Sequence, residues 1–296
     1  MNIKKCQICP RKCNADRTAG TGICGCNDKI KVAKACLHKW EEPCICGKNG
    51  AGAVFFSGCN LKCCYCQNYI LSHEKFGREI SDERLSEIFL ELQEKGACNI
   101  DLVTPTPYVY DIIKALDRIK NKLDIPIVYN CGGYERPETI KMLNGYIDIY
   151  LPDFKYYDNS YALKYSGIPD YFENASESIK EMISQTGKII IDDDNIMQKG
   201  TIIRHLALPK LRHDSIKLME WISENLPKDS FLISLMSQYT PFPHIKEKFP
   251  ELDRRITKME YNSILKKVAE LGLEGYCQDK SSAKSDYTPD FDLEGV

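Results

Sequence analysis

The sequence has no long apolar run and almost no excess of charge. No uninterrupted apolar stretch approaches the roughly 20 residues that a membrane-spanning helix needs. Residues 1–6 include two lysines but no apolar segment follows them, so we expect no secretory signal. The 40 Lys and Arg residues nearly balance 42 Asp and Glu residues, which gives a net charge of −2. This balance provides no electrostatic basis for binding a membrane surface or nucleic acid, so neither is expected as a partner.

Cysteine, in contrast, is abundant. The 296 residues include 15 cysteines. Disulfides are rare in reducing compartments, and an odd number of cysteines in a chain of this length does not suggest a disulfide framework. We therefore expect most of the clustered cysteines to be metal ligands, and we predict a cytoplasmic metalloprotein.

Three cysteines form the most informative motif. Cys59, Cys63 and Cys66 have the spacing C-x3-C-x2-C and directly follow an apolar, strand-like stretch at residues 53–57. Cysteine thiolates hold cubane iron–sulfur clusters, and three protein ligands on four irons leave one iron open for chemistry. Zinc is the alternative, but it requires four ligands, and the adjacent Cys63 and Cys64 cannot easily converge on one ion.

This loop resembles the signature loop of the radical S-adenosylmethionine (SAM) enzymes, which also has an aromatic residue, here Tyr65, before the last cysteine. The resemblance implies a [4Fe–4S] cluster at Cys59, Cys63 and Cys66 whose open iron chelates SAM. It also places Tyr65 in the cofactor site. Cys64 is not part of the pattern.

Short apolar strands alternate with amphipathic helices from residue 53 onward, the pattern of βα units around a parallel sheet. Six such units are too few to close an eight-stranded barrel. We predict an α/β fold: an open partial (β/α)6 barrel of radical SAM type at residues 51–240, after a cysteine-rich metal-binding segment at 1–50. Residues 241–296 would form a C-terminal helix and a polar, mobile tail from residue 279. The six expected strands are 53–57, 100–103, 125–130, 147–151, 201–206 and 231–236.

Several phrases resemble the proteins similar to pyruvate formate-lyase activating enzyme, and together they cover the chain up to about residue 277. They are Trp40-Glu41-Glu42-Pro43-Cys44, Phe56-Ser57-Gly58-Cys59-Asn60-Leu61 with Cys66-Gln67-Asn68, Leu102-Val103-Thr104-Pro105-Thr106, Tyr150-Leu151-Pro152-Asp153-Phe154-Lys155, Ile203-Arg204-His205-Leu206 and Ser234-Leu235-Met236-Ser237-Gln238-Tyr239.

This resemblance implies roles for residues at the ends of strands. Asp153 and Lys155 look like an Asp-x-Lys pair that lines the cofactor site, and we assign them as catalytic candidates. Arg204 would meet the SAM carboxylate, whereas the neighbouring His205 is expected to be structural. Asn130 is a candidate for the ribose or methionine end of SAM.

Thr104 and Thr106 occupy the place where activating enzymes have a Gly-Gly-Glu-Pro-type turn that contacts the SAM amino group. This chain lacks those glycines and the carboxylate. Backbone carbonyls or the two threonine hydroxyls would have to replace them, although Thr106 could equally cap the helix that follows.

A second cysteine group lies near the amino terminus, where Cys6, Cys9, Cys13 and Cys24 form C-x2-C-x3-C-x10-C. Four thiolates in so few residues, with glycines for tight turns, predict a second metal site. We favour an iron–sulfur cluster over zinc, and Cys26 or Cys44 could replace Cys24 as the fourth ligand.

The predicted function is reductive cleavage of SAM to a 5′-deoxyadenosyl radical, with a flavodoxin- or ferredoxin-type electron donor. On the family analogy the substrate is a glycine of a glycyl-radical enzyme. Modification of another peptide, an RNA or a metabolite is the alternative. From other classes, a non-catalytic electron carrier or a zinc-stapled binding protein would explain the cysteines, but not the strand-end charges.

Overall fold

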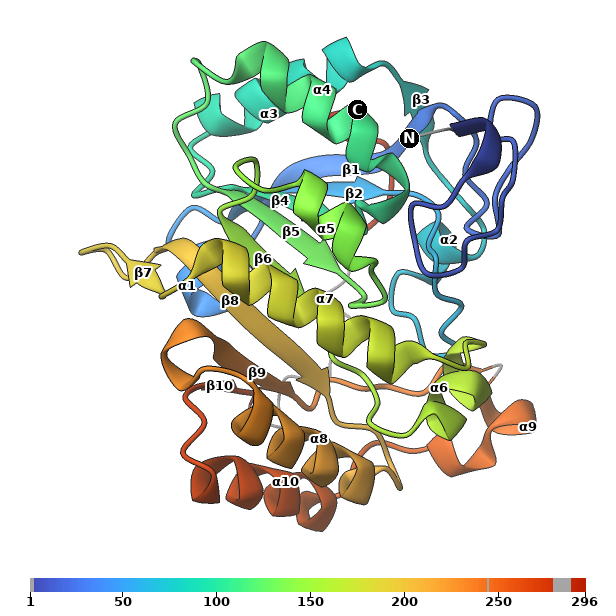
Figure 1. Ribbon diagram of the computed structural model, residues 1–296, viewed down its shortest axis with the longest axis vertical. Helices are drawn as coiled ribbons and strands as arrows, with labels where there is room; N and C mark the ends of the chain where they lie inside the picture. Colours follow the sequence, from blue (N-terminus) through green and yellow to red (C-terminus); the bar gives the residue numbers. More distant parts are fainter. Residues whose placement is uncertain (1–2, 244, 279–288) are drawn as a thin grey trace.

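A single mixed sheet organises the chain (Figure 1). The computed structural model describes residues 3–243, 245–278 and 289–296. The sheet has ten strands in the order β10-β9-β8-β6-β5-β4-β2-β1-β3, with β7 paired to β8. The strands are β1 (Ile30–His38), β2 (Ala51–Phe56), β3 (Arg78–Ile80), β4 (Ile100–Val103), β5 (Ile127–Cys131), β6 (Ile149–Pro152), β7 (Ile190–Ile191), β8 (Met197–Leu206), β9 (Leu232–Met236) and β10 (Gly275–Cys277).

The central strands are parallel, as expected for βα units. Strands β2, β4, β5, β6, β8, β9 and β10 pair in parallel, while β1 and β3 add an antiparallel edge. The six predicted strands are all present, so the predicted open parallel sheet is confirmed. The sequence prediction missed β1, β3 and the short β10, and β1 brings residues of the cysteine-rich segment into the sheet.

Helices cover the outer face of the parallel sheet (Figure 1). In α3, the Ser81 hydroxyl accepts a hydrogen bond from the Arg84 N–H group at 3.2 Å, and Leu85, Ile88 and Phe89 are buried. Burying each such side chain contributes roughly 1.5–3 kcal/mol relative to exposure. The helices are α1 (Pro43–Cys46), α2 (Tyr69–Ser72), α3 (Asp82–Glu94), α4 (Val109–Ile119), α5 (Pro137–Met142), α6 (Asn159–Ser166), α7 (Tyr171–Thr186), α8 (Arg212–Asn225), α9 (Ile245–Lys248) and α10 (Lys258–Glu270).

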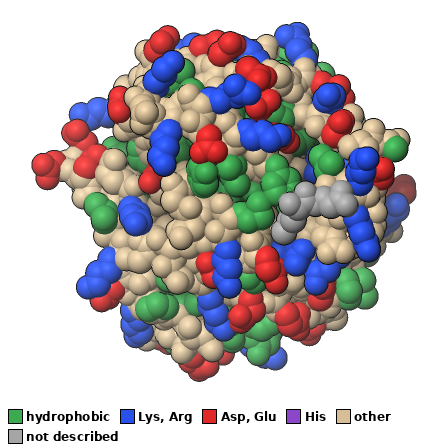
Figure 2. Space-filling view, turned by 45° about the horizontal axis from the view of Figure 1, so that its top comes forward, with side chains coloured by type: hydrophobic (Ala, Val, Ile, Leu, Met, Phe, Trp, Pro, Cys, Tyr) green, Lys and Arg blue, Asp and Glu red, His purple; other side chains and the backbone are tan. Residues whose placement is uncertain are grey.

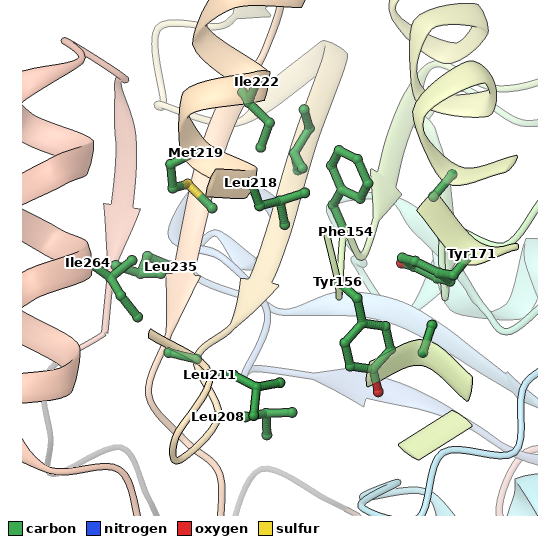
Figure 3. Close-up of a cluster of buried hydrophobic side chains, with 14 of the residues drawn as sticks. Phe154, Tyr156, Tyr171, Leu208, Leu211, Leu218, Met219, Ile222, Leu235 and Ile264 are labelled. Atoms are coloured by element: carbon green, nitrogen blue, oxygen red, sulfur yellow. The ribbon is translucent and has the colours of Figure 1, made fainter. Parts of the chain in front are cut away.

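The largest outer core lies between the sheet and helices α7, α8 and α10. Leu218 and Ile222 of α8 point toward the aromatic ring of Phe154, which comes just after β6 (Figure 3). Tyr171 at the start of α7 fixes the same turn, since its hydroxyl donates to the Asp153 carbonyl oxygen at 2.8 Å and accepts from the Lys155 N–H group at 2.9 Å. The core thereby sets the positions of residues 153–155.

The inner face is polar near the carboxyl ends of the strands and apolar near their amino ends. There α1 packs against the inner face, with Ile45 buried among Val128, Ile149 and Ile202. The Asn99 side-chain amide donates to the Ile45 carbonyl oxygen at 2.8 Å and fixes α1 beside the start of β4. The short helix therefore closes one end of the space inside the partial barrel, which we call the lumen.

Residues 289–296, at the end of the chain, pack against β1. Hydrogen bonds join the Ala35 N–H group to the Glu294 carbonyl oxygen (2.8 Å) and the Leu293 N–H group to the Ala33 carbonyl oxygen (3.1 Å). The Phe291 ring meets the Phe55 ring edge to face. The prediction of a mobile tail therefore differs from the structure at residues 289–296, because the apolar Phe291 ring anchors this segment. Residues 279–288 of the predicted tail lie outside the described residues.

The surface shown in Figure 2 carries Lys, Arg, Asp and Glu side chains of both signs interspersed, which agrees with the near-zero net charge. Within the part of the chain that the structure describes, no helix is long and apolar enough to cross a membrane.

The outer core makes stability dependent on pH through His205. This buried side chain shares hydrogen bonds with the Phe154 carbonyl oxygen (2.7 Å) and the Ser215 hydroxyl (2.8 Å), and burial lowers its pKa from 6.5 to about 4. The unfolded state therefore binds more protons between these values. Stability should be complete above pH 6.5 and decrease by about 3 kcal/mol as the pH falls to 4.

In denaturant unfolding, the His205→Gln variant should lose less stability than the wild type between pH 6.5 and 4. The loss that remains is due to His38, because burial lowers the pKa of this residue to about 4 as well. His213→Gln, at an exposed position of α8, is the control. An unchanged pH slope in the His205 variant would contradict the assignment.

Candidate functional site

A cavity of about 470 Å³ occupies the lumen. Its walls come from the loop after β2, from the ends of the parallel strands and from residues 39–43, which lead into α1 and which we call the floor. Predicted site residues that line it are Cys59, Cys63, Tyr65, Cys66, Thr104, Asn130, Asp153, Lys155 and Arg204. Thr106 does not line it.

The cysteine loop starts where β2 ends, and a close backbone contact fixes its direction. Gly58 has φ +86°, and a Cβ atom there would lie 2.2 Å from the Cys26 sulfur. Its N–H group donates to the Leu71 carbonyl oxygen at 2.9 Å, and the Cys59 N–H group donates to the Cys24 carbonyl oxygen at 3.3 Å. Only glycine fits this position without displacing a neighbour.

Each of the three motif sulfurs accepts one hydrogen bond. Cys59 Sγ accepts from the Leu61 N–H group (3.4 Å), Cys63 Sγ from the Ser166 hydroxyl (3.0 Å) and Cys66 Sγ from the Ser72 hydroxyl (3.3 Å). Such donors stabilise negative charge on sulfur and tune the potential of an iron–sulfur cluster. The arrangement therefore suits thiolates at Cys59, Cys63 and Cys66.

Burial raises the pKa of all three thiols, that of Cys66 to about 11, and the proximity of the other motif cysteines adds to the effect for Cys59 and Cys66. Three buried thiolates need a positive partner, and bound iron supplies one. The residues present thus fit a [4Fe–4S] cluster.

Tyr65 is part of the cysteine loop, and its hydroxyl belongs to a chain of hydroxyl groups. Its hydroxyl is 2.5 Å from that of Tyr156, which in turn lies 2.8 Å from the Ser166 hydroxyl, the donor to Cys63. Tyr65 is buried, and its ring packs edge to face on Tyr239. It can therefore influence the cysteine sulfur through this chain.

Asp153 joins the two cations of the lumen. Its carboxylate lies 2.6 Å from Lys155 Nζ and 3.1 Å from Arg204 Nε. Burial opposes ionisation, but Lys155 and Arg204 prevail and lower the pKa of Asp153. Although burial opposes it, Asp153 raises the pKa of Lys155, and nearby Cys63 and Cys66 contribute in the same direction. Lys155 is therefore an ammonium ion beside the cysteine loop.

Arg204 extends this network toward the floor. Its guanidinium group donates to Glu41 Oε2 at 3.1 Å and to the Asn130 side-chain oxygen, and the Asn130 amide donates to Asp101 Oδ2 at 3.3 Å. The predicted residues Asn130, Asp153, Lys155 and Arg204 are thus brought into one connected cluster.

The two threonines of the β4 turn have different surroundings. Thr104 lines the cavity with φ +62°, an unusual conformation for a β-branched residue that costs of order 1–3 kcal/mol. Thr106 is buried, and its hydroxyl donates to Glu135 Oε1 at 2.6 Å. It makes no side-chain cap hydrogen bond to α4, which follows a 3-10 turn at Thr106–Tyr108.

Sequence reasoning missed four residues of this site. Glu41 and Glu42 belong to the phrase Trp40-Glu41-Glu42-Pro43-Cys44, but the sequence does not show that the segment between β1 and α1 lines the lumen. Ser72 and Ser166 are sulfur donors far apart in the chain, and no sequence signal distinguishes them from other serines.

The amino-terminal cysteines lie beside the cysteine loop. Cys6, Cys9 and Cys26 are buried in the core that also includes β1 and α3, and Cys13 and Cys24 pack against it. A Cβ atom at Gly22 would lie 3.3 Å from the Cys24 sulfur and 3.5 Å from the Cys13 sulfur, so these two thiols are close. Cys44, in contrast, lies on α1.

Arg17 accompanies this group and was not predicted. Its guanidinium is buried and donates to the carbonyl oxygens of Asn27 (2.5 and 2.9 Å) and Pro107 (2.7 Å). Burial opposes its charge, but Cys24, Cys26 and Cys6 raise its pKa. A buried cation facing thiols is suited to balance thiolate charge.

Within residues 3–243, 245–278 and 289–296, no three His, Cys, Asp or Glu side chains are arranged around a single metal ion. Cysteine ligands of a cubane bind separate iron atoms and so do not converge on one point. The second metal site stays a prediction.

Comparison with known proteins agrees with the resemblance seen in the cysteine loop. Residues 53–191 match the model of the Radical SAM superfamily. The uncharacterized protein MJ0674 of Methanocaldococcus jannaschii is 28% identical over 282 residues, which are 92% of this chain and 76% of the relative.

Among solved structures, Streptococcus suis SuiB bound to its precursor peptide SuiA has a TM-score of 0.49 at 14% identity, covering 75% of this chain and 46% of SuiB. HydG, a maturase of the [FeFe]-hydrogenase, has a TM-score of 0.49 at 13% identity, covering 72% of this chain and 47% of HydG. This chain spans less than half of either structure. The stretch that matches the Radical SAM superfamily model, residues 53–191, includes the cysteine loop and the strand ends that line the cavity up to β6.

Proposed function

We propose that this protein is a radical SAM enzyme whose Cys59, Cys63 and Cys66 hold a [4Fe–4S] cluster at the wall of the lumen. The observation that carries the proposal is that each of these cysteines lines the cavity and that each sulfur accepts one hydrogen bond. A structural thiol needs no such donor, whereas a thiolate ligand of a redox cluster gains stability from it.

The reaction follows from the cofactor. A [4Fe–4S] cluster held by Cys59, Cys63 and Cys66 would supply one-electron reduction of SAM to methionine and a 5′-deoxyadenosyl radical, which would take a hydrogen atom from the substrate. The electron would come from a low-potential donor of flavodoxin or ferredoxin type.

Residues around the cavity have distinct roles in this proposal. Lys155, an ammonium ion near Cys63 and Cys66, stabilises negative charge at the cluster. Asp153 keeps Lys155 in place and is available to the ribose or amino group of SAM, together with Asn130 and the strained Thr104 turn.

The resemblance to activating enzymes extends the proposal to a glycine hydrogen on a partner glycyl-radical enzyme. Modification of another peptide, an RNA or a metabolite is the alternative. Each uses the same radical, so the first experiment concerns SAM cleavage itself.

Substitution of the cysteines tests the ligand assignment. Anaerobically reconstituted protein given SAM and dithionite should form 5′-deoxyadenosine, and Cys59→Ala, Cys63→Ala or Cys66→Ala should abolish it, because a lost ligand destabilises the cluster. Cys64→Ala is the matched control and should keep most activity. Full activity of the Cys63 variant, or none in an intact, reducible wild type, would refute the proposal.

The hydroxyl donor to Cys63 offers a test that does not depend on turnover. Ser166→Ala removes the 3.0 Å hydrogen bond to sulfur and should lower the cluster reduction potential by tens of millivolts, because the more negative reduced state loses more stabilisation. Spectroscopic redox titration measures this shift. Ser160→Ala, on the same helix α6, should leave the potential unchanged; equal potentials in all three proteins would count against the role of Ser166.

We also propose that the amino-terminal cysteines hold a second metal site, favouring an iron–sulfur cluster over zinc, with Cys26 beside Cys24 as the further candidate ligand. The buried Arg17, whose charge these thiols favour, supports this assignment.

Metal analysis of Cys9→Ala tests this second site. The variant should lose one bound site while the spectrum of the catalytic cluster persists, because Cys9 lies outside the signature loop. Cys277→Ala, at an exposed cysteine, should bind as much metal as the wild type. Unchanged metal content in the Cys9 variant would rule out Cys9 as a ligand.

A further inference from the structure

Among the buried and half-buried groups around the lumen, carboxyl groups outnumber cations. Four carboxyl groups, those of Glu41, Glu42, Asp101 and Asp153, lie around two such cations, Lys155 and Arg204. Lys39 also lines the cavity, but its side chain is exposed. Buried charges are costly unless they are paired, so any surplus carboxylate needs a partner.

Both cations are already committed. Lys155 Nζ pairs with Asp153 Oδ2 at 2.6 Å. Arg204 divides its guanidinium between Asp153 Oδ1 and Glu41 Oε2, each at 3.1 Å. Both carboxylate oxygens of Asp153 are therefore paired, and Arg204 is also paired with Glu41.

Two buried carboxyl oxygens remain. Among the described residues, Glu42 Oε2 and Asp101 Oδ1 are buried without a hydrogen-bond partner. Burial and the nearby Glu41 raise the pKa of Asp101 well above its usual range. Asp101 also does not line the cavity, whereas Glu42 does.

Glu42 is thus the acceptor left over at the floor. Its side chain is 92% buried, since the residue exposes 8%, and burial raises its pKa while Arg204 and the Ser234 hydroxyl oppose that rise. A buried, unpartnered oxygen on a residue that lines the cavity is suited to a hydrogen-bond donor that enters with the ligand.

Aromatic rings border the same part of the cavity. Trp40 and Tyr276 line it together with Glu42, and Trp40 is 54% exposed, so the cavity reaches the surface beside this ring. Aromatic faces beside a carboxylate attract ammonium and guanidinium groups.

The floor lies at the far side of the ion-pair network from the cysteine loop. Lys155 is next to Cys63 and Cys66, Asp153 follows, and Arg204 then connects to Glu41 and Glu42. A ligand seated at the floor therefore does not compete with the cysteines for space.

We propose that the floor recognises a positively charged group of the substrate, an alkylammonium or a guanidinium, with Glu42 Oε2 as its acceptor and Trp40 beside it. The inference rests on the proposed function, because it takes this cavity as the substrate site. It gives the substrate class a chemical definition: a cationic group bound at the floor, with the hydrogen to be removed held toward the cysteine loop.

Binding of matched probes tests the inference. Calorimetry with cluster-reconstituted protein and SAM would compare acetyl-Gly-Lys-Gly-amide with acetyl-Gly-norleucine-Gly-amide, which lacks only the ammonium group, and with free agmatine. The lysine peptide or agmatine should bind at least about tenfold more tightly than the norleucine peptide. Preference for agmatine indicates a small-molecule source of the cation, and preference for the lysine peptide indicates a peptide.

Substitutions assign the preference to its residue. Glu42→Gln keeps the size but removes the charge, and should reduce the preference to less than about threefold. Glu42→Asp should retain part of it, and Glu224→Gln, at an exposed position of α8, should retain all of it. Melting temperatures report whether each variant folds, and if Glu42→Gln does not, the wild-type comparison and Glu42→Asp still decide.

The inference would be overturned if neither the lysine peptide nor agmatine bound the wild type more tightly than the norleucine peptide, or if the preference persisted in Glu42→Gln. Assaying 5′-deoxyadenosine in the same preparations separates the two proposals. SAM cleavage without cation preference removes only the substrate class, whereas cation preference without SAM cleavage removes the proposed reaction and leaves the binding site.

Discussion

Asp153 lies half-buried just after β6 and bonds to Lys155 and Arg204 at once. Without that carboxylate, Lys155 would lose its partner, and Arg204 would keep only Glu41 and the Asn130 amide oxygen. An unpaired buried charge costs several kcal/mol. The position of Asp153 depends in turn on Tyr171, which holds the backbone of the turn, and on Gly133, where a Cβ atom would lie 2.0 Å from the Asp153 carbonyl oxygen. The outer aromatic core and the polar lumen are therefore parts of one arrangement.

The two cysteine groups share a piece of backbone. Cys59 donates to the Cys24 carbonyl oxygen, and Gly58 leaves room for the Cys26 sulfur. Any side chain at residue 58 would thus push against the amino-terminal cysteines and the signature loop together. This contact makes the folding of residues 3–26 and the geometry of the cysteine loop interdependent.

Much of the fold could be predicted because its signals are local. Apolar runs bounded by helices gave the six parallel strands, and the spacing of Cys59, Cys63 and Cys66 gave the loop. β1 was missed because the cysteines around it suggested a metal-binding segment, and β10 because three residues beginning with Gly275 carry little strand signal. Strand ends and the resemblance to activating enzymes led to Asp153, Lys155, Asn130 and Arg204, which all line the cavity. Ser166, Arg17 and Glu42 were not predicted, because their roles depend on contacts between distant segments. Whether a charged side chain is buried cannot be deduced from the residues next to it in the sequence.

The pairing of residues 293 and 294 with β1 has a practical consequence. Beyond the three residues that pair with β3, this segment supplies the hydrogen-bonding partner on the outer side of β1, at Ala33 and Ala35. An unpaired strand edge is a template for adding strands from other molecules. Shortening the chain at this end, or attaching a purification tag that displaces Phe291 from Phe55, would expose such an edge and favour aggregation during expression.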